Sequence, residues 1–446
     1  MTYHQDHSEY DAIVVGGGLA GMLAAAIVAR AGRSVLVLEQ AKAFGGRAGT
    51  QVRDGVSLNF GAHALYKSGH AAHLLRDLGV SYTGQSPPAY PRFMTRGRDF
   101  YSIPVGLLEL ATSKALGLRD KWRFIRFFMG LKRADARALD ATPLASWLES
   151  KLGTGPAFDL ARIFFRVATY SENAARQSAG AALDQLRCGL GGVLYLDGGW
   201  QTLIDGLRFR AEEAGATTRT GARAAAIQAN TDRVTVRLTD GEVLHARTTV
   251  LAVGPEVAVE LLDLPADDSL VRWAATRTPV RAACLDVVLD NLPLPHRQVV
   301  FGMDRPLYYS VHSAAARLAP DGVSVVHLLK YLGPDAGPAA DHERELEAYM
   351  DLIQPGWRAH TRTRRFLPNM IASQALCTAA GSGGNGRPGP IVRGRPNVFM
   401  AGDWVGPDGQ LADAAAASAE VAAKHVLAIL AEPRLTPARR PAHVAD

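Results

Sequence analysis

A glycine-rich turn between two apolar runs constrains this chain more than any other feature. Residues 16–21 read Gly-Gly-Gly-Leu-Ala-Gly, directly after the apolar run 12–15. Gly16 permits a tight turn, Gly18 lets the backbone approach a pyrophosphate, and Gly21 lets the following helix pack closely on the strand. The pattern therefore predicts a strand, a turn and a helix that bind the ADP part of a dinucleotide.

An acidic residue stands where a dinucleotide site needs one. Glu39 follows a second apolar run and lies 23 residues after Gly16 (39 minus 16), close to the roughly 20 of the fingerprint. Its carboxylate would accept hydrogen bonds from the adenosine ribose, with Gln40 beside it. The first helical N–H groups, those of Leu19 and Ala20, would face the phosphates. A dehydrogenase that uses only a nicotinamide cofactor would share this pattern, but no second glycine fingerprint is evident.

Three further blocks accompany the turn. Residues 44–48 read Phe-Gly-Gly-Arg-Ala, residues 401–404 read Ala-Gly-Asp-Trp, and residues 409–415 read Gly-Gln-Leu-Ala-Asp-Ala-Ala. With these blocks the chain resembles the flavin-dependent amine oxidase and phytoene desaturase superfamily, in which they surround FAD. The resemblance covers most of the chain and implies that FAD is the cofactor.

The resemblance gives two of these blocks a place along FAD. Gly46 and Arg47 would run along the pyrophosphate and the flavin, because the arginine fork can hold phosphate with two hydrogen bonds. Gly402 precedes Asp403, whose carboxylate would bind the ribityl chain or the phosphate region.

The resemblance also implies contacts from three other stretches. A helix expected over 413–428 would place its N-terminal amides against the pyrimidine edge of the flavin, where reduced flavin carries negative charge. A β meander expected over 216–254, with a hairpin signal at Asp240-Gly241, would contact the adenine. The residues implied at FAD by these stretches, and by the segment that returns past the flavin, are Leu411, Ala412, Arg223, Ala224, Gly61, Ala62 and His63.

Three side chains are candidates for chemistry or covalent attachment. His63 is a proton acceptor or a ring packed on FAD, and we favour packing. Lys330 resembles the lysine that amine oxidases hold near flavin N5, although a solvent-facing lysine on a strand is the favoured interpretation. Cys377 lacks the Gly-Gly-Cys pattern of the covalent flavin link in monoamine oxidases, so non-covalent FAD is expected.

The blocks also separate the subfamilies. Ala-Gly-Asp-Trp follows the late strand, where monoamine oxidases carry a Gly-Thr-Glu type of sequence, so the chain is more similar to phytoene desaturase-related and protoporphyrinogen oxidase-like members. This similarity implies an oxidoreductase that desaturates or oxidises a lipophilic small molecule, such as an isoprenoid, by hydride transfer to flavin N5. The alternatives are an amine oxidase that makes an imine and hydrogen peroxide, and a non-redox isomerase that uses reduced flavin.

Composition bounds the class of protein. The 446 residues, 48% hydrophobic and 21% charged, suit a globular chain with room for two or three domains. The three cysteines are too few and too widely spaced for a disulfide framework or a metal site, which favours a cytoplasmic setting. We expect no signal peptide and no apolar run near the roughly 20 residues of a membrane span. The 43 acidic residues balance most of the positive charge, so no nucleic-acid partner is expected.

The positions of the blocks predict the fold class. We expect an α/β chain with a discontinuous Rossmann-type FAD-binding domain that includes the meander, together with an α+β substrate domain. The substrate domain would place a sheet over the flavin and helices behind it. The expected parts are the FAD-binding stretches 1–85, 191–267 and 365–432, the helical subdomain 86–190, the substrate sheet 268–364 and a disordered tail 433–446.

A basic and aromatic helix is expected within residues 119–133. At helical spacing Arg119, Arg123, Arg126 and Arg133 fall on one face, with aromatic side chains on the others. The favoured interpretation is a helix packed on its own domain with a solvated basic face. The alternative is a peripheral contact with anionic lipid at the inner face of the membrane, where a lipophilic substrate could be collected. The sequence leaves the oligomeric state open.

Overall fold

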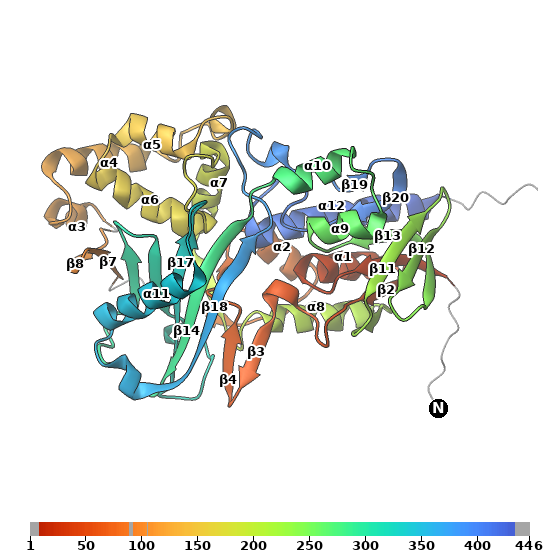
Figure 1. The fold of residues 1–446 in the computed structure, drawn as a ribbon, viewed down its shortest axis with the longest axis horizontal. Helices are drawn as coiled ribbons and strands as arrows, with labels where there is room; N and C mark the ends of the chain where they lie inside the picture. The colour runs from red at the N-terminus through yellow and green to blue at the C-terminus, as the bar shows by residue number, and fades with distance from the viewer. Residues whose placement is uncertain (1–8, 89–91, 105, 433–446) are drawn as a thin grey trace, which may run out of the picture.

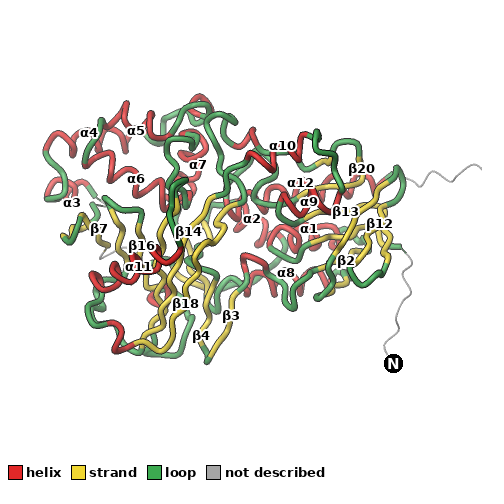
Figure 2. The backbone as a smooth tube through the Cα atoms, viewed as in Figure 1, coloured by secondary structure: helices red, strands yellow, loops and turns green. Residues whose placement is uncertain are grey.

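Two large sheets organise the part of the chain that the structure describes (Figure 1). The computed structural model describes residues 9–88, 92–104 and 106–432. An eight-stranded sheet lies at one end of the molecule, a seven-stranded sheet lies beside it, and a group of helices lies above the smaller sheet (Figure 2). The tail expected over 433–446 lies outside the described residues.

The eight-stranded sheet is parallel except at its meander and at one short strand. β1 is parallel to β2 and β13, β13 is parallel to β20, and β11, β12 and β13 form an antiparallel meander. The strands are β10 (Thr217–Arg219), β2 (Val35–Leu38), β1 (Tyr10–Val15), β13 (Val243–Leu251), β12 (Val234–Leu238), β11 (Ala224–Ala229), β20 (Arg395–Met400) and β19 (Ile391–Val392). This arrangement confirms the expected Rossmann-type domain with its meander.

Helices cover both faces of this sheet because its central strands are apolar on both faces. Val14 and Val37 turn toward one group of helices, and Ile13 and Leu36 turn toward the other. The first group is α1 (Leu19–Arg30), α2 (His70–Asp77), α8 (Gln201–Glu213) and α12 (Leu411–Ala431), and the second is α9 (Pro255–Leu262) and α10 (Ser269–Thr276).

The helix α12 corrects one expectation from the sequence. It has 21 residues and is apolar enough that by length and composition α12 could cross a membrane, whereas no such run was expected. Half of its most apolar window is buried inside the protein, where Ala416, Ala419 and Ala423 belong to the core shared with α1. The small alanine side chains let the two helices approach closely, so α12 is explained as a core helix.

The seven-stranded sheet carries the substrate side of the molecule. Its strands, in spatial order, are β18 (Thr361–Ser373), β14 (Val280–Leu289), β17 (Ser324–Leu332), β16 (Leu307–Val311), β15 (Val299–Gly302), β7 (Arg92–Arg96) and β8 (Asp99–Ser102). The helix α11 (Ala339–Ile353) covers one face through Leu346 and Met350. The opposite face contacts Gly61 and Ala62, in the segment that follows β4 (Val56–Asn59).

Two features of this sheet differ from the expectation. β7 and β8 arise within 86–190, a stretch expected to be mainly helical, and β7 pairs in parallel with β15. Strands this short carry little periodicity, so pairing with a distant strand decides their structure. β18 starts at Thr361 and pairs with β14, so it runs through the expected boundary at residue 365.

The remaining elements are a group of helices and several short strands. The helical group is α3 (Leu107–Thr112), α4 (Leu118–Gly130), α5 (Leu144–Leu152), α6 (Pro156–Thr169) and α7 (Ala179–Leu190), all within the stretch 86–190 that was expected to be mainly helical. Aromatic rings join these helices, as where Phe127 of α4 meets Trp147 of α5 at 5.3 Å between ring centres. The small strands are β3 (Thr50–Arg53), β4 (Val56–Asn59), β5 (Leu65–Tyr66), β6 (Gly84–Gln85) and β9 (Val193–Leu196).

Candidate active site

Backbone packing shapes the glycine turn after β1. Gly16 has a φ of +110°, and a Cβ on it would lie 2.5 Å from the carbonyl oxygen of Ala252. A Cβ on Gly21 would lie 1.9 Å from the carbonyl oxygen of Gly16. Side chains at these two positions would push α1 away from the strands, so both glycines are required by the turn itself.

Gly18 is different because open space lies in front of it. Its φ is −80°, and within 4 Å a Cβ would meet only the carbonyl oxygen of Gly45, at 3.7 Å. Gly46 faces it, with a Cβ position 3.7 Å from the Cα of Gly18. The helix α1 begins here, at Leu19 and Ala20, without a side-chain cap, so its positive end is available to an anion. A pyrophosphate fits here because there is open space in front of Gly18, backbone N–H groups face that space, and the positive end of α1 points into it.

Glu39 lies on the other side of the glycine turn. Its buried carboxylate accepts hydrogen bonds from the N–H of Gly17 at 2.8 Å and from the N–H of Ala41 at 2.8 Å. Its own carbonyl oxygen accepts from the loop just before β11, which begins at Ala224. Gln40 is exposed beside it. The structure therefore brings together the residues that the sequence places on the adenosine side.

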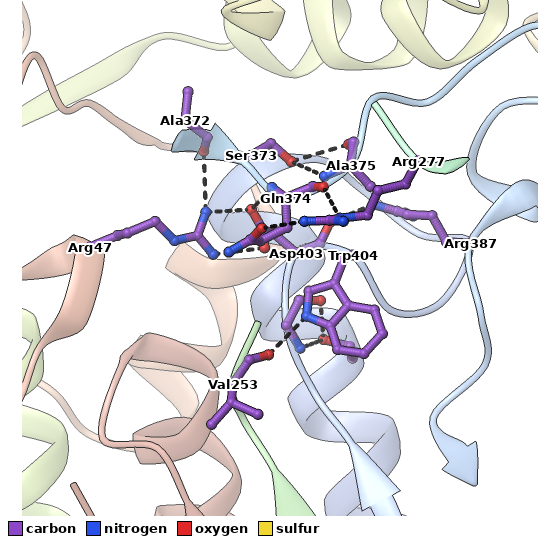
Figure 3. A network of polar contacts seen from close by, with 12 residues as sticks. Arg47, Val253, Arg277, Ala372, Ser373, Gln374, Ala375, Arg387, Asp403 and Trp404 are labelled. Carbon is purple, nitrogen blue, oxygen red and sulfur yellow. Dashed lines mark hydrogen bonds and ion pairs between the residues drawn. The ribbon is translucent and has the colours of Figure 1, made fainter. Parts of the chain in front are cut away.

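Arg47 and Asp403 meet although 356 positions separate them (Figure 3). The two Nη atoms of Arg47 donate to the two carboxylate oxygens of Asp403, each at 2.7 Å. Arg47 lies on a 3₁₀ turn, Gly46–Ala48, and Gly45 just before it donates its N–H to the carbonyl oxygen of Gly17 at 2.8 Å. The glycine turn, the Gly-Gly-Arg block and the Ala-Gly-Asp block thus converge.

The environment of Asp403 keeps it ionised. Burial raises the pKa of Asp403, but the charge of Arg47 and hydrogen bonds from Arg47 and the N–H of Gln374 outweigh burial and hold the pKa below its ordinary value. The side chain of Arg47 is 47% exposed and that of Asp403 only 3%. Asp403 therefore orients Arg47, whose free edge can reach a phosphate oxygen.

The loop between β20 and α12 is held in one shape. Buried Arg387 donates to the carbonyl oxygens of Asp403 and Gly409, each at 3.0 Å (Figure 3 shows Arg387 beside Asp403). Gly402 donates its N–H to Ser418 of α12 at 2.9 Å. Leu411, the first residue of α12, has a φ of +54°, a strained conformation for leucine. This loop sets the position of the helix N-terminus, where Leu411 and the following Ala412 are the expected donors to the flavin.

His63 is packed rather than open to a substrate. Its Nδ1 lies 3.0 Å from the carbonyl oxygen of Gly61, and its Nε2 lies 3.1 Å from that of Arg47. The ring meets the edge of Trp200 at 5.1 Å, and burial lowers the pKa of His63. Both ring nitrogens face backbone carbonyl oxygens, and the single N–H of the neutral ring donates to one of them, so His63 packs between the Gly61 segment and Arg47.

The family follows from comparison with known proteins. Residues 19–427 match the family of flavin-containing amine oxidoreductases. The chain belongs to this family. It is a flavin-dependent oxidoreductase with FAD as its cofactor, as the residue blocks predict. Two features of the site fit this cofactor. A side chain larger than that of Gly18 would fill the open space in front of α1, and the Arg47–Asp403 pair lies nearby.

The chain is also similar to individual proteins. A phytoene dehydrogenase of Streptomyces griseus is 26% identical to this chain over 280 residues. The matched region is 56% of this chain and 55% of the relative, so the chain spans about half the length of this relative. A solved oxidoreductase structure from Methanosarcina mazei has a TM-score of 0.75 at 19% identity and covers 93% of this chain and 99% of its own. A triple mutant of putrescine oxidase has a TM-score of 0.73 at 16% identity, covering 94% and 99%. The two structures show a shared fold.

One face of the seven-stranded sheet lies against the segment of Gly61 and Ala62, which we call the flavin segment. A Cβ on Gly61 would lie 2.4 Å from Cε of Met370 on β18, and Tyr170 donates its hydroxyl to the carbonyl oxygen of Ala62 at 2.9 Å. Apolar side chains from that segment, the sheet and the end of α6 form what we call the flavin-side cluster. Its members are Ala62, Ala282, Cys284, Val299, Tyr308, Leu329 and Tyr331, with partly buried Val167, Tyr170, Phe301, Leu367 and Met370.

A buried ionic group that sequence reasoning missed borders this cluster. Asp286 of β14 lies 2.5 Å from Nδ1 of His327 on β17, and its other oxygen accepts from Nε of Arg365 on β18 at 2.9 Å. Asp286 and His327 are fully buried. Burial raises the pKa of Asp286, but His327 and Arg365 outweigh burial and hold it below its ordinary value. The available signal was a titratable residue flanked by apolar neighbours in each of two largely apolar strands, Asp286 in β14 and His327 in β17.

The hydrogen bond to Asp286 determines what His327 can do. An ionised carboxylate only accepts, so Nδ1 of His327 is the donor in this hydrogen bond, and in the neutral tautomer of the ring the lone pair lies on Nε2. Among the described residues, Nε2 of His327 has no hydrogen-bond partner. Cys284 donates to Asp286 at 3.0 Å, and burial, together with that carboxylate, holds the pKa of Cys284 well above its ordinary value. Cys284 therefore stays a thiol, and Arg365 balances the buried charge.

Two other candidate residues lie elsewhere. Lys330 is on the opposite face of the sheet, where its Nζ pairs with Glu345 of α11 at 2.5 Å. The structure therefore does not bring Lys330 to the flavin side, and the expectation of a solvent-facing lysine is also wrong, because the side chain is only 16% exposed between the sheet and α11. Cys377 is buried, with its carbonyl oxygen accepting from the N–H of Ser178 at 2.9 Å, and burial raises the pKa of its thiol. Non-covalent attachment of FAD stays a prediction.

Proposed function

We propose that this flavoenzyme dehydrogenates an apolar small molecule and forms a double bond between two neighbouring carbon atoms. The observation that supports it is the pairing of the apolar flavin-side cluster with the buried Asp286–His327 pair on one face of the seven-stranded sheet. When bound, FAD supplies the hydride acceptor at flavin N5, so the protein needs a separate acceptor for the proton.

His327 is suited to take that proton. Its Nε2 carries the lone pair, is buried and has no partner among the described side chains and backbone groups. The adjacent substrate C–H bond gives its proton to Nε2, and the electron pair of that bond becomes the new carbon–carbon double bond. Ionised Asp286 stabilises the imidazolium that forms, because the two groups already share a hydrogen bond of 2.5 Å.

Charges around the flavin-side cluster disfavour an amine substrate. The two nearby carboxylates are already paired, Asp286 with Arg365 and Glu172 with Arg166 at 2.5 Å. The guanidinium of Arg166 also lies 5.9 Å from the ring centre of Tyr331, a member of the cluster. A protonated amine would meet a cation and carboxylates that are already neutralised, whereas an apolar chain needs no counter-ion.

The relatives suggest which molecules to test. The curated relative named phytoene dehydrogenase supports an isoprenoid polyene as the first candidate. The structural neighbour named putrescine oxidase makes putrescine the matched test of the amine alternative.

Anaerobic reduction of the flavin tests the proposal. Yellow holoenzyme is mixed without oxygen with phytoene in detergent micelles and, separately, with putrescine, and the visible flavin absorbance is followed. We expect the polyene alone to bleach the flavin and to gain a double bond, which mass spectrometry detects as the loss of two hydrogens. Bleaching by putrescine alone would overturn the proposal in favour of an amine oxidase. Rearrangement of the polyene by reduced enzyme, without loss of hydrogen, would favour an isomerase.

A further inference from the structure

The outer face of α4 exposes large apolar side chains at one edge of the molecule. Leu118 is 86% exposed, Trp122 63% and Met129 72%, and Leu108 of the neighbouring α3 is 78% exposed. Figure 1 shows α3 and α4 at the end of the molecule opposite the meander strands β11 and β12. Single exposed apolar residues are common, but several at one place mark an interaction surface.

Basic side chains accompany this apolar group. The guanidinium of Arg126 lies over the ring of Trp122, 5.3 Å from its centre. Arg123, which helical spacing groups with the other arginines, instead turns inward and donates to the carbonyl oxygen of Leu152 at 3.1 Å. The exposed residues that we call the α4 outer face are Leu108, Leu118, Arg119, Trp122, Arg126, Met129, Lys132 and Arg133.

The inner face of α4 shows that this exposure does not reflect a misplaced helix. Phe124 and Phe127 are buried, and their rings meet Phe164 of α6 at 6.2 Å and Trp147 of α5 at 5.3 Å. The helix thus already has a packed apolar side. The apolar residues on its outer side are additional to what folding of this group requires.

We propose that the α4 outer face docks this protein on a membrane surface that contains anionic lipid. Trp122 and its apolar neighbours would enter the interfacial region, and the basic side chains would bind lipid phosphates. A second copy of the chain is a poorer occupant, because a symmetric dimer through this face would bring Arg119, Arg126 and Arg133 against their own counterparts. The inference needs neither the flavin nor the substrate, so it stands apart from the proposed function.

The position of the face also suits a substrate taken from lipid. α4 packs on α6 through Phe124 and Phe164. The end of α6 contributes Val167, and Tyr170 directly follows it in the flavin-side cluster. One layer of helices therefore separates the proposed membrane face from the substrate side.

Co-sedimentation with vesicles tests the docking surface. Holoenzyme is mixed with phosphatidylcholine vesicles, with or without phosphatidylserine, and the bound fraction is measured at about 0.05 and about 0.5 M salt. We expect binding to the anionic vesicles at low salt and much weaker binding at high salt. Each of the variants Trp122→Ser and Arg126→Glu should lower the partition coefficient, and the pair of changes should lower it by about tenfold or more.

Matched surface variants control for the loss of any exposed residue. Phe209→Ser removes an aromatic ring that is 59% exposed and also lies under an arginine, on α8, and Arg237→Glu reverses an exposed charge on β12. Both should bind vesicles like the parent chain, and all variants should keep their flavin. Equal loss in the controls, or equal binding to neutral vesicles, would overturn the proposal. So would a concentration-dependent dimer, seen by light scattering, that Trp122→Ser dissociates.

Discussion

The nucleotide-binding half and the substrate half of this molecule are built by different rules. Around the glycine turn the protein offers mainly backbone, as at Gly18, where a Cβ would enter the space in front of α1. On the seven-stranded sheet it offers side chains from three strands, with Asp286, His327 and Arg365 meeting by strand pairing. The first half depends on the residue type at fixed spacing, and the second depends on which strands are neighbours.

This difference explains why only one half is marked by motifs. A site made of backbone groups requires glycine at fixed positions, so it leaves a recognisable motif in the sequence. A side-chain site places no such restriction on the neighbouring positions of its strands, as β14 and β17 show around Asp286 and His327. The difference also predicts that substitutions in the first half remove the cofactor, whereas substitutions in the second half leave it bound and change the chemistry.

The largest expected effect is at Gly18. Gly18→Val should abolish FAD retention while the protein still folds, because the conformation of Gly18 suits any residue and its Cβ would meet only one atom within 4 Å. Flavin released on heating measures retention, and circular dichroism measures folding. Gly333→Val is the control, since a Cβ there would also meet open space, on the substrate side. A Gly18→Val protein with full flavin content would refute the phosphate role.

The next effect is at His327. His327→Gln should lower turnover by about 10²- to 10⁴-fold while the flavin content is unchanged, because the proton acceptor is lost but the polar contact with Asp286 can be kept. His312→Gln changes a buried histidine whose ring packs edge-on against that of His327, 4.5 Å between ring centres, and which has no carboxylate partner among the described residues, so it measures how much turnover is lost through packing alone. Turnover that survives in His327→Gln would contradict the assignment.

A smaller effect is expected at Asp403. Asp403→Asn should lower the free energy of unfolding of the apoprotein by about 1–3 kcal/mol, limited by the exposure of Arg47. The pKa of Asp403 is below its ordinary value, so its contribution is complete above about pH 3.9 and is lost as the pH falls through the lower folded value. Urea unfolding at a series of acidic pH values measures this slope. An unchanged slope in Asp403→Asn would show that the pair does not stabilise the fold.

The smallest effect is at Lys330. Lys330→Met should change turnover by less than about tenfold, because the side chain lies on the face of the sheet away from Gly61 and Ala62, and should lower the free energy of unfolding by about 1–2 kcal/mol, because Glu345 loses its partner. Steady-state kinetics and thermal unfolding measure both quantities. A large loss of turnover with the flavin retained would show that Lys330 takes part in the reaction.

The motifs predicted the nucleotide half residue by residue and the substrate half only in outline. Gly18, Glu39, Arg47 and Asp403 lie around one place because each answers a local requirement of the backbone or of a charge. The buried group at Asp286 was missed because its partners come from separate strands with no fixed spacing. β7 was missed for the same reason, since its pairing partner β15 follows far along the chain.

The amino-acid sequence by itself determined the cofactor and the Rossmann-type sheet. Close approach of the backbone to a ligand and continuous apolar strands both restrict residue types over short distances. Only the tertiary structure decided which side chains share the flavin side. It turned Lys330 toward α11, placed His327 beside Asp286 and left Trp122 exposed. These outcomes depend on strand register and helix packing, which are set by contacts between residues far apart in the chain.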